Sequence, residues 1–196
     1  MSALSETVGI VLAAGLSRRF GATNKLLAPL RGQPLASYIA RSVAALPLMG
    51  RIAVCPAGDE GLTAIFRTLD LDVIFNDDSA AGQASSLALG VAAALPFQPR
   101  ALLVCLADMP FITGAHLRDL VDGLDAQCTV TASAPAINAA PSPPAAFAQV
   151  HFAALMAQRG DQGARALIKG ASKHIAPAAE LLDFDTQEDF DAVGLG

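Results

Sequence analysis

Short apolar runs alternate with stretches of helical spacing along most of this chain. The runs are "VGIVLAA", "RIAVCP", "DVIFN", "ALLVCLADMP" and "CTVTASA". A continuous apolar run is typical of a strand buried on both faces, and strands separated by helices of about ten residues form crossover units in a parallel sheet. We therefore predict an α/β fold: a single-domain, three-layer α/β/α structure with a Rossmann-like, mostly parallel sheet.

Helices are expected at residues 35–46, 62–70, 84–95 and 113–124, with Asp59 or Glu60 near the start of the second and Thr113 as N-cap of the fourth. After Ala134 the pattern loosens. The stretch 135–147 is interpreted as a loop with an edge strand, 151–158 and 163–170 as helices, and 181–185 ("LLDFD") as a last short strand. Because 196 residues show no internal repeat and no clear linker, one domain is expected over residues 1–196.

The composition argues against several classes of protein. A net charge of −5 argues against nonspecific nucleic-acid binding, and no apolar run reaches the roughly 18 residues of a membrane span. The N-terminus lacks the basic segment of a secretory signal. Cys55, Cys105 and Cys128 show no C-x-x-C spacing, and the first two lie in apolar runs, where buried thiols are expected. We predict a reduced, cytoplasmic protein without nucleic-acid or membrane partners.

The charges are unevenly distributed. Between Glu6 and Asp59 there is no acidic residue, whereas the cations Arg18, Arg19, Lys25, Arg31, Arg41 and Arg51 all fall in this interval. An acid-free quarter in an acidic protein is better explained by an anionic ligand than by accident. The small residues of "AAGLS" let backbone N–H groups approach that ligand closely, as a triphosphate requires. The loop matches neither the Walker A motif nor G-x-G-x-x-G.

In a parallel sheet, ligands bind beyond the carboxyl ends of the strands. The loops there would gather Gly15, Arg19, Lys25, Gln83, Ser85, Ser86, Asp108 and Asp185. Asp108 ends a buried run, where an acid is costly unless it is hydrated, paired or bound to metal; a turn acid or helix cap is the simpler alternative. Mg²⁺ prefers one or two carboxylates together with substrate phosphates, and Asp108 and Asp185 would supply that pair.

These motifs resemble those of a known family. "LAAGLSRRFGATNKLL" is similar to the signature loop of the nucleotidyltransferases that activate cofactors and sugars, with Gly15, Arg19 and Lys25 in the signature places. "LADMP" and "DFDTQEDF" look like their two metal-binding segments. Within that superfamily the chain resembles the molybdenum cofactor cytidylyltransferase-like group. The resemblance extends over "GQASSLALGV", "PPAAF", "HFAALMAQRGDQGARALI" and the tail, and implies a glycosyltransferase-A type of fold.

The resemblance implies Mg²⁺-dependent transfer of a nucleoside monophosphate to a phosphorylated acceptor, with release of pyrophosphate. Its catalytic residues would be Arg19, Lys25 and Asp108, and its metal ligands Asp108 and Asp185. The nucleotide would contact Leu12, Ala13, Ala14, Gly15, Ser17, Arg19, Lys25, Gln83, Ser85, Ser86 and Asp108. For Gln83, Ser85 and Ser86, a role as turn and helix-cap residues is the equal alternative. An acceptor phosphate is already ionised near neutral pH, so no strong base is needed, and the expected site loops contain no histidine.

The identity of the donor and acceptor substrates depends on fewer residues than the type of reaction does. Relatives that transfer CMP typically read Leu-Ala-Ala-Gly where this chain has Ala14, which favours CTP with molybdopterin as acceptor and a molybdenum hydroxylase apoenzyme as a possible recipient. Ser142 and Pro143 depart from the Gly-His-Pro or Gly-Asn-Pro of related sequences, which leaves the acceptor open. The stretch "GDQGAR" (160–165) suits the acceptor side or a plain turn, and Arg18 is either solvated or faces the acceptor. The alternatives are GTP as donor, a sugar or polyol phosphate as acceptor, and a non-catalytic pterin-carrying chaperone.

Overall fold

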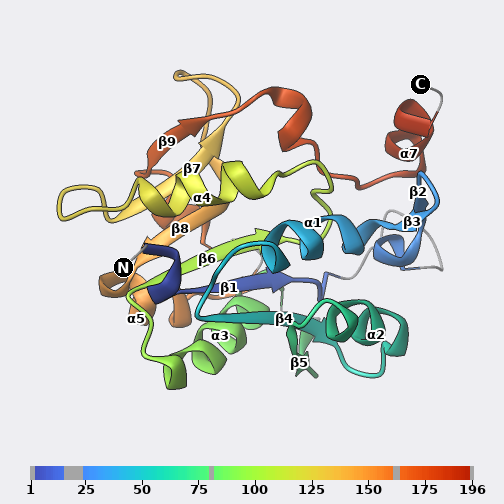
Figure 1. Cartoon of the computed structure of the whole chain (residues 1–196), viewed down its shortest axis with the longest axis horizontal. Helices are drawn as coiled ribbons and strands as arrows, with labels where there is room; N and C mark the ends of the chain where they lie inside the picture. Colours follow the sequence, from blue (N-terminus) through green and yellow to red (C-terminus); the bar gives the residue numbers. More distant parts are fainter. Residues whose placement is uncertain (1–2, 16–23, 80–81, 161–163, 195–196) are drawn as a thin grey trace.

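The computed structural model describes residues 3–15, 24–79, 82–160 and 164–194. Its main sheet has seven strands in the order β5-β4-β1-β6-β8-β7-β9 (Figure 1). The strands are β1 (Thr7–Leu12), β4 (Gly50–Pro56), β5 (Asp72–Asn76), β6 (Ala101–Leu106), β7 (Val130–Ala134), β8 (Ser142–Ala148) and β9 (Ser172–Ile175). Only β8 runs antiparallel to its neighbours, so the predicted mostly parallel sheet is confirmed. Strands β2 (Pro29–Leu30) and β3 (Gln33–Pro34) form a separate antiparallel pair.

Helices cover both faces of the sheet. On one face lie α1 (Leu35–Ala44), α2 (Glu60–Thr68) and α4 (Gly114–Asp122), and on the other α3 (Gln83–Ala94), α5 (Phe152–Met156) and α6 (Arg165–Ile168). Helix α7 (Gln187–Gly194) follows the last strand, and the short 3₁₀ helices are η1 (Ala3–Glu6), η2 (Lys25–Leu27), η4 (Leu95–Phe97), η5 (Gln149–His151) and η7 (Ala178–Leu181). The three predicted layers are present (Figure 1).

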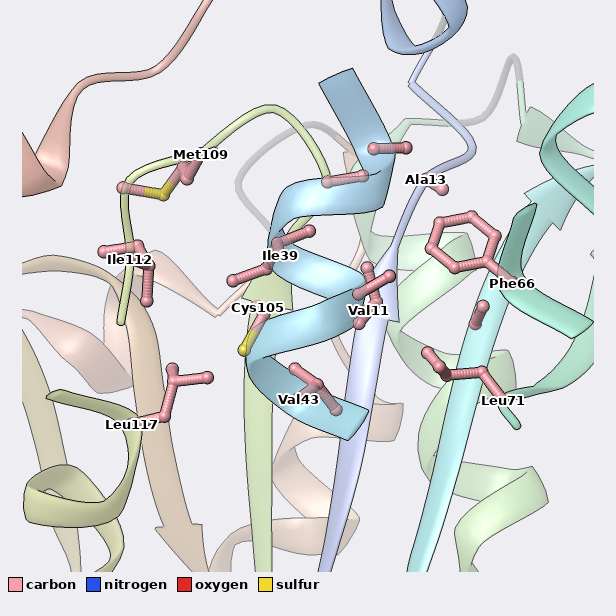
Figure 2. Packing of buried hydrophobic residues seen from close by; sticks show 14 of the residues in the cluster. Val11, Ala13, Ile39, Val43, Phe66, Leu71, Cys105, Met109, Ile112 and Leu117 are labelled. Carbon is pink, nitrogen blue, oxygen red and sulfur yellow. The ribbon is translucent and has the colours of Figure 1, made fainter. Parts of the chain in front are cut away.

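Two apolar clusters separate the layers because alternate residues of a strand point to opposite faces. Val11 of β1 packs with Ile39 and Phe66 under α1 and α2, as Figure 2 shows, whereas its neighbour Ile10 belongs to the cluster under α3. Both faces of β1 are therefore buried, which explains its unbroken apolar sequence. Among the described residues no helix is both long enough and apolar enough to span a membrane.

The helix starts agree with the sequence. The side chain of Asp59 accepts a hydrogen bond from Leu62 N at the start of α2, and that of Thr113 accepts one from His116 N at the start of α4. Both are N-caps of the predicted type. Cys55 and Cys105 are buried, as expected.

The C-terminal third differs from its prediction in two places. Strand β8 is not an edge strand. It lies between β6 and β7, where Ala145, Ala146 and Phe147 are fully buried. Residues 181–185 do not form a strand, and the last strand is the earlier β9. A backbone hydrogen bond from Phe184 N to Asp108 O (3.0 Å) ties the 181–185 segment to the loop after β6.

Gly90 lies in the middle of α3, where it faces the sheet. An added Cβ would stand 2.7 Å from Ile10 Cγ2 and 3.2 Å from Val54 Cγ2, closer than carbon atoms normally approach. The glycine costs roughly 1 kcal/mol of helix propensity relative to alanine. Because glycine has no side chain, α3 can pack close to β1, and this packing compensates for the lower helix propensity.

Candidate active site

The polar centre of the molecule is an ion-paired lysine at the carboxyl edge of the sheet. Lys25 Nζ donates to Asp108 Oδ2 (2.8 Å) and to Asp185 Oδ1 (2.6 Å). The three residues come from the loop after β1, the loop after β6 and the segment before α7, yet they meet at one point. The predicted association of Lys25, Asp108 and Asp185 is thus present in the structure.

This centre lies where the chain reverses its direction across the sheet. From β1 the chain proceeds outward to β4 and β5, and then returns to β6 on the other side of β1. The loops after β1 and β6 therefore diverge and leave a crevice, which is the usual ligand site of such sheets. Leu12 O accepts from Ala107 N (3.1 Å) and Val54 O from Ala13 N (2.8 Å), so the chain is held at this edge from both sides.

The charges at the centre are strongly coupled. Burial lowers the pKa of Lys25, but the Asp108 and Asp185 carboxylates outweigh burial and raise it above its ordinary value, so the ammonium is charged. Burial raises the pKa of the neighbouring Asp183, and the negative charges of Asp108 and Asp185 add to that rise. Among the described residues, one ammonium faces several carboxylates, and this surplus of negative charge favours a cation.

The donor set fits a divalent metal ion. Asp108 Oδ1 is buried and has no hydrogen-bond partner among the described residues, so one carboxylate oxygen is available for a ligand. No three or more side chains of His, Cys, Asp or Glu cluster as a metal site in the described part of the chain. An Mg²⁺ ion needs fewer protein ligands, because substrate phosphates and water complete its shell.

Lys25 is positioned by two residues that the sequence analysis did not single out for the site. Asn24 Oδ1 accepts from Leu26 N (3.0 Å), which caps η2, and Asn24 Nδ2 donates to Asp59 Oδ2 (2.7 Å). The other oxygen of Asp59 caps α2 at Leu62 N (2.9 Å). We call this chain of bonds the Asn24–Asp59 clamp. It fixes the backbone on both sides of Lys25 to the start of a helix.

Asp185 is positioned in a similar way. Asp189 Oδ2 accepts from the backbone N–H groups of Asp185 (2.8 Å) and Thr186 (2.7 Å) and from Thr186 Oγ1 (2.9 Å). The hydrogen bond from Thr186 N lowers the pKa of Asp189, which therefore stays ionised. Thr186 and Asp189 have the T-x-x-D spacing of a capping box, a signal present in the sequence.

The polar start of α3 is organised by a residue that the sequence analysis missed. Asn76, the last residue of β5, is buried, and its Nδ2 donates to Ser85 Oγ (2.9 Å) and Ser86 Oγ (2.8 Å). Ser86 is itself buried, and Ser85 Oγ also lies 2.8 Å from Gly82 O. The two hydroxyls are thus hydrogen-bonded within the protein, while Gln83 lines a cavity. Neither serine caps α3, whose N-cap is Gly82.

The first loop is described only at its start. Leu12, Ala13 and Ala14 are buried at the end of β1, and an added Cβ on Gly15 would meet no atom of the described residues within 4 Å. Because glycine has no side chain, the backbone at this position can come close to a phosphate. Ser17, Arg18 and Arg19 lie outside the described residues.

A cavity of about 490 Å³ lies beside the centre, on the α3 and α6 face of the sheet. Its lining includes Leu12 of β1, Gln83 of α3 and Asp183, and continues over β6 and β8 to α6. A volume of this size is in the range of small-molecule sites.

The fold and this centre define a nucleotidyltransferase: an α/β sheet with a lysine and paired carboxylates at its switch point. Residues 9–177 match the MobA-like NTP transferase domain, and the chain belongs to that family. This assignment confirms the expected family and the expected class of enzyme, and it argues against the non-catalytic carrier.

Individual relatives agree with the assignment. The chain is 30% identical to the purine catabolism protein PucB of Bacillus subtilis over 199 residues, which covers 95% of each chain. It is 32% identical to the molybdenum cofactor guanylyltransferase of Cereibacter sphaeroides over 106 residues, or 54% of this chain and 52% of the relative. Among solved structures, the Mycobacterium sp. strain JC1 homologue of Mycobacterium tuberculosis Rv0371c superposes with a TM-score of 0.79 at 26% identity, covering 96% and 95% of the two chains.

Proposed function

We propose that this enzyme transfers CMP from CTP to the terminal phosphate of molybdopterin and releases pyrophosphate, with Mg²⁺ as the metal. The observation that supports a transfer of this kind is the contact of Lys25 Nζ with the Asp108 and Asp185 carboxylates at the switch point of the sheet. Phosphoryl and nucleotidyl transfer depend on positioning and on neutralising phosphate charge, which are the properties that this centre has.

In the proposed reaction an acceptor phosphate oxygen attacks the α-phosphorus of CTP. A new P–O bond forms, the bond from the α-phosphorus to the bridging oxygen breaks, and its electron pair leaves with pyrophosphate. The acceptor phosphate is ionised near neutral pH, so no side chain has to remove a proton. Lys25 supplies positive charge to the phosphates, and the backbone at Ala14 and Gly15, with Ser17 and Arg19, orients them.

Asp108 and Asp185 are the residues that would hold the metal. Their support comes from the unpartnered Oδ1 of Asp108 and from the surplus of carboxylates over ammonium groups around Lys25. When bound, Mg²⁺ withdraws charge from the phosphate oxygens and stabilises the leaving pyrophosphate. The two aspartates need only hold the ion in place, and their hydrogen-bonded backbones serve that purpose.

The choice of CTP depends on Ala14. Its Cβ takes up space in the buried start of the first loop, where a purine needs more room than a pyrimidine. GTP is the second candidate donor, because one relative is a guanylyltransferase. Ala14 therefore deserves a direct comparison of the two nucleotides.

One assay tests the proposal. Pyrophosphate release is measured with each of the four NTPs, with and without Mg²⁺, and with molybdopterin, a sugar phosphate or a polyol phosphate as acceptor. We expect release only with Mg²⁺, CTP and molybdopterin together. Preference for GTP would overturn the cytidylyl assignment, and preference for a sugar or polyol phosphate would overturn the acceptor assignment.

A further inference from the structure

The Lys25 ammonium lies where two carboxylates converge. Its Nζ is 2.8 Å from Asp108 Oδ2 and 2.6 Å from Asp185 Oδ1, so one positive charge is shared by two negative charges. A divalent ion held by the same two residues would use the same negative charge, and an ammonium this close to both carboxylates would repel it. The charged lysine and a metal ion therefore compete for one pair of aspartates.

Burial makes this competition strong. The side chain of Lys25 is 9% exposed and that of Asp108 is 19% exposed, so water and salt screen the charges only partly. A lysine buried to this degree is stable only when it is paired, and Asp108 and Asp185 are its ion-pair partners among the described residues. The ammonium can therefore leave the two carboxylates readily only when another anion receives it.

The backbone at Lys25 is fixed, but its side chain has the means to move. Asn24 holds this backbone through Leu26 N (3.0 Å) and Asp59 Oδ2 (2.7 Å), the bonds of the Asn24–Asp59 clamp. Beyond the backbone, lysine has a flexible four-carbon stem and an ammonium with three donors, which can turn to a new acceptor. A triphosphate at this edge of the sheet would offer several anionic oxygens, so it is an anion that could receive the ammonium.

We propose that Lys25 is a resident counter-ion that keeps the metal site closed until a nucleoside triphosphate binds. Before binding, the ammonium neutralises Asp108 and Asp185, as in the structure. When the triphosphate binds, the ammonium moves to its phosphates, and both carboxylates become available to the metal ion. Metal and nucleotide consequently bind together, and the metal alone binds weakly. This inference rests on the proposed function and adds to it the order in which the centre is assembled.

The first test measures metal binding without any nucleotide. Mn²⁺ is the probe, and its binding is followed by the relaxation rate of water protons, which rises when the protein holds the ion. Lys25→Met removes the charge and keeps a side chain of similar length, so we expect it to bind Mn²⁺ about tenfold or more tightly than the wild type, or about 1.4 kcal/mol. Equal Mn²⁺ affinity of the wild type and Lys25→Met would overturn the inference.

Two further variants locate the effect. Arg118→Met removes one exposed positive charge from α4 and is the matched control, which should bind Mn²⁺ as the wild type does. Asp108→Asn in the Lys25→Met background should abolish the gain in Mn²⁺ affinity, because it removes one of the two carboxylates. A gain that survives Asp108→Asn, or that Arg118→Met reproduces, would overturn the inference, since the gain would then arise from net charge or from another site.

The melting temperature gives a second readout, which also covers a variant that folds poorly. Lys25→Met leaves two carboxylates without their counter-ion, so it should melt below the wild type when no metal is present. Saturating Mn²⁺ should raise the melting temperature of Lys25→Met by several degrees and that of the wild type much less. A variant that folds only with Mn²⁺ would support the inference, whereas one that Mn²⁺ does not stabilise would overturn it.

The outcomes for the counter-ion and for the proposed function are distinct. If Lys25→Met gains affinity for Mn²⁺ but the wild type releases pyrophosphate with none of the four NTPs, the proposed function is overturned and the counter-ion role stands. If the wild type transfers CMP in a Mg²⁺-dependent reaction but Lys25→Met gains no affinity for Mn²⁺, the counter-ion role is overturned and the proposed function stands.

Discussion

The centre around Lys25 and the cavity beside it are built by different means. Around the centre and at the start of α3, side chains are tied to one another: the Asn24–Asp59 clamp holds the backbone around Lys25, and Asn76 holds Ser85 and Ser86. The cavity has largely apolar walls, and Arg165 and Lys169 line it without ion pairs in the described part of the chain.

This difference separates two tasks. A buried polar network leaves unsatisfied groups when one member changes, so it enforces one geometry. Apolar walls keep their function through many substitutions of similar volume. The centre around Lys25 is therefore fixed in geometry, while the cavity is defined by its shape and by two cations.

Asp108→Ala should nearly abolish transfer, with a loss of about 10³-fold, because it removes both a metal ligand and a partner of Lys25. Pyrophosphate release at limiting and saturating Mg²⁺ measures the effect, and the melting temperature checks the fold. Asp122→Ala, an exposed acid at the end of α4, is the control. Normal turnover of Asp108→Ala at limiting Mg²⁺ would show that the metal assignment is wrong. Asp185→Ala should follow the same pattern more mildly.

Lys25→Ala should lower kcat/KM by about 10²-fold, on the order of 3 kcal/mol, because it removes positive charge that the transition state needs. The loss should appear with every acceptor, since Lys25 is proposed to act on the phosphates of the nucleotide. Steady-state kinetics with CTP varied at fixed acceptor measures it. A variant that loses only acceptor affinity would contradict that assignment.

Ala14→Gly should erode the preference for CTP over GTP by roughly tenfold to a few hundredfold, because one methyl group is worth about 1–3 kcal/mol of discrimination. The ratio of kcat/KM for the two nucleotides is compared in wild type and variant. If the substitution leaves the preference intact, base selection belongs instead to the 83–86 segment.

Removing one bond of the Asn24–Asp59 clamp should have a smaller effect on kcat than removing Lys25 itself. Asn24→Ala and Asp59→Asn should each lower kcat about tenfold, the value of one hydrogen bond, with KM for the acceptor unchanged. Asp59→Asn keeps an oxygen for the α2 cap, whereas Asp59→Ala should also lose about 1 kcal/mol of stability. In the Lys25→Ala background the effect of Asn24→Ala on kcat should vanish, because the clamp acts through Lys25. Additive losses would contradict that role.

The stability of the fold should depend on pH through His116, which is buried on α4. Burial lowers the pKa of His116 to about 4, the nearby His174 adds to this, and Asp119 opposes it. The unfolded chain gains a proton near pH 6.5, so this contribution is complete above that pH and is lost as pH falls toward 4, by about 2–3 kcal/mol. Urea unfolding at several pH values measures it. His116→Gln should flatten the dependence, and an unchanged slope would show that His116 titrates normally.

Much of the N-terminal two thirds could be predicted from its sequence. Buried parallel strands such as β1 and β6 have unbroken apolar runs, and Asp59 and Thr113 mark helix starts by residue type alone. The approach of Lys25 to Asp108 followed from strand-end loops meeting at one edge. Asp185 also reaches Lys25, but the strand at 181–185 that was expected to place it there does not form.

The C-terminal third was harder for physical reasons. Pro143 and Pro144 suggested an edge, but they stand near the start of β8, before the residues that pair with β6. The edge strand β9 is largely polar and exposed, so it has no apolar signal. Asn76 bonds to serines that follow on the next helix, a relation that residue type alone does not reveal. The T-x-x-D spacing of Thr186 and Asp189 is a sequence signal that could have indicated the role of Asp189, but the sequence analysis did not use it.

The position of the polar start of α3 depends on Gly90, which lies farther along the same helix. Gln83 and Ser86 lie in the first turn of α3. At Gly90, about two helical turns after Gln83, the Ile10 methyl group limits how closely the helix can approach the sheet. A bulkier residue would act as a wedge, lifting the helix as a rigid rod and shifting the polar start of α3 relative to the first loop. The position of the polar start of α3 therefore depends on the absence of a Cβ atom at residue 90.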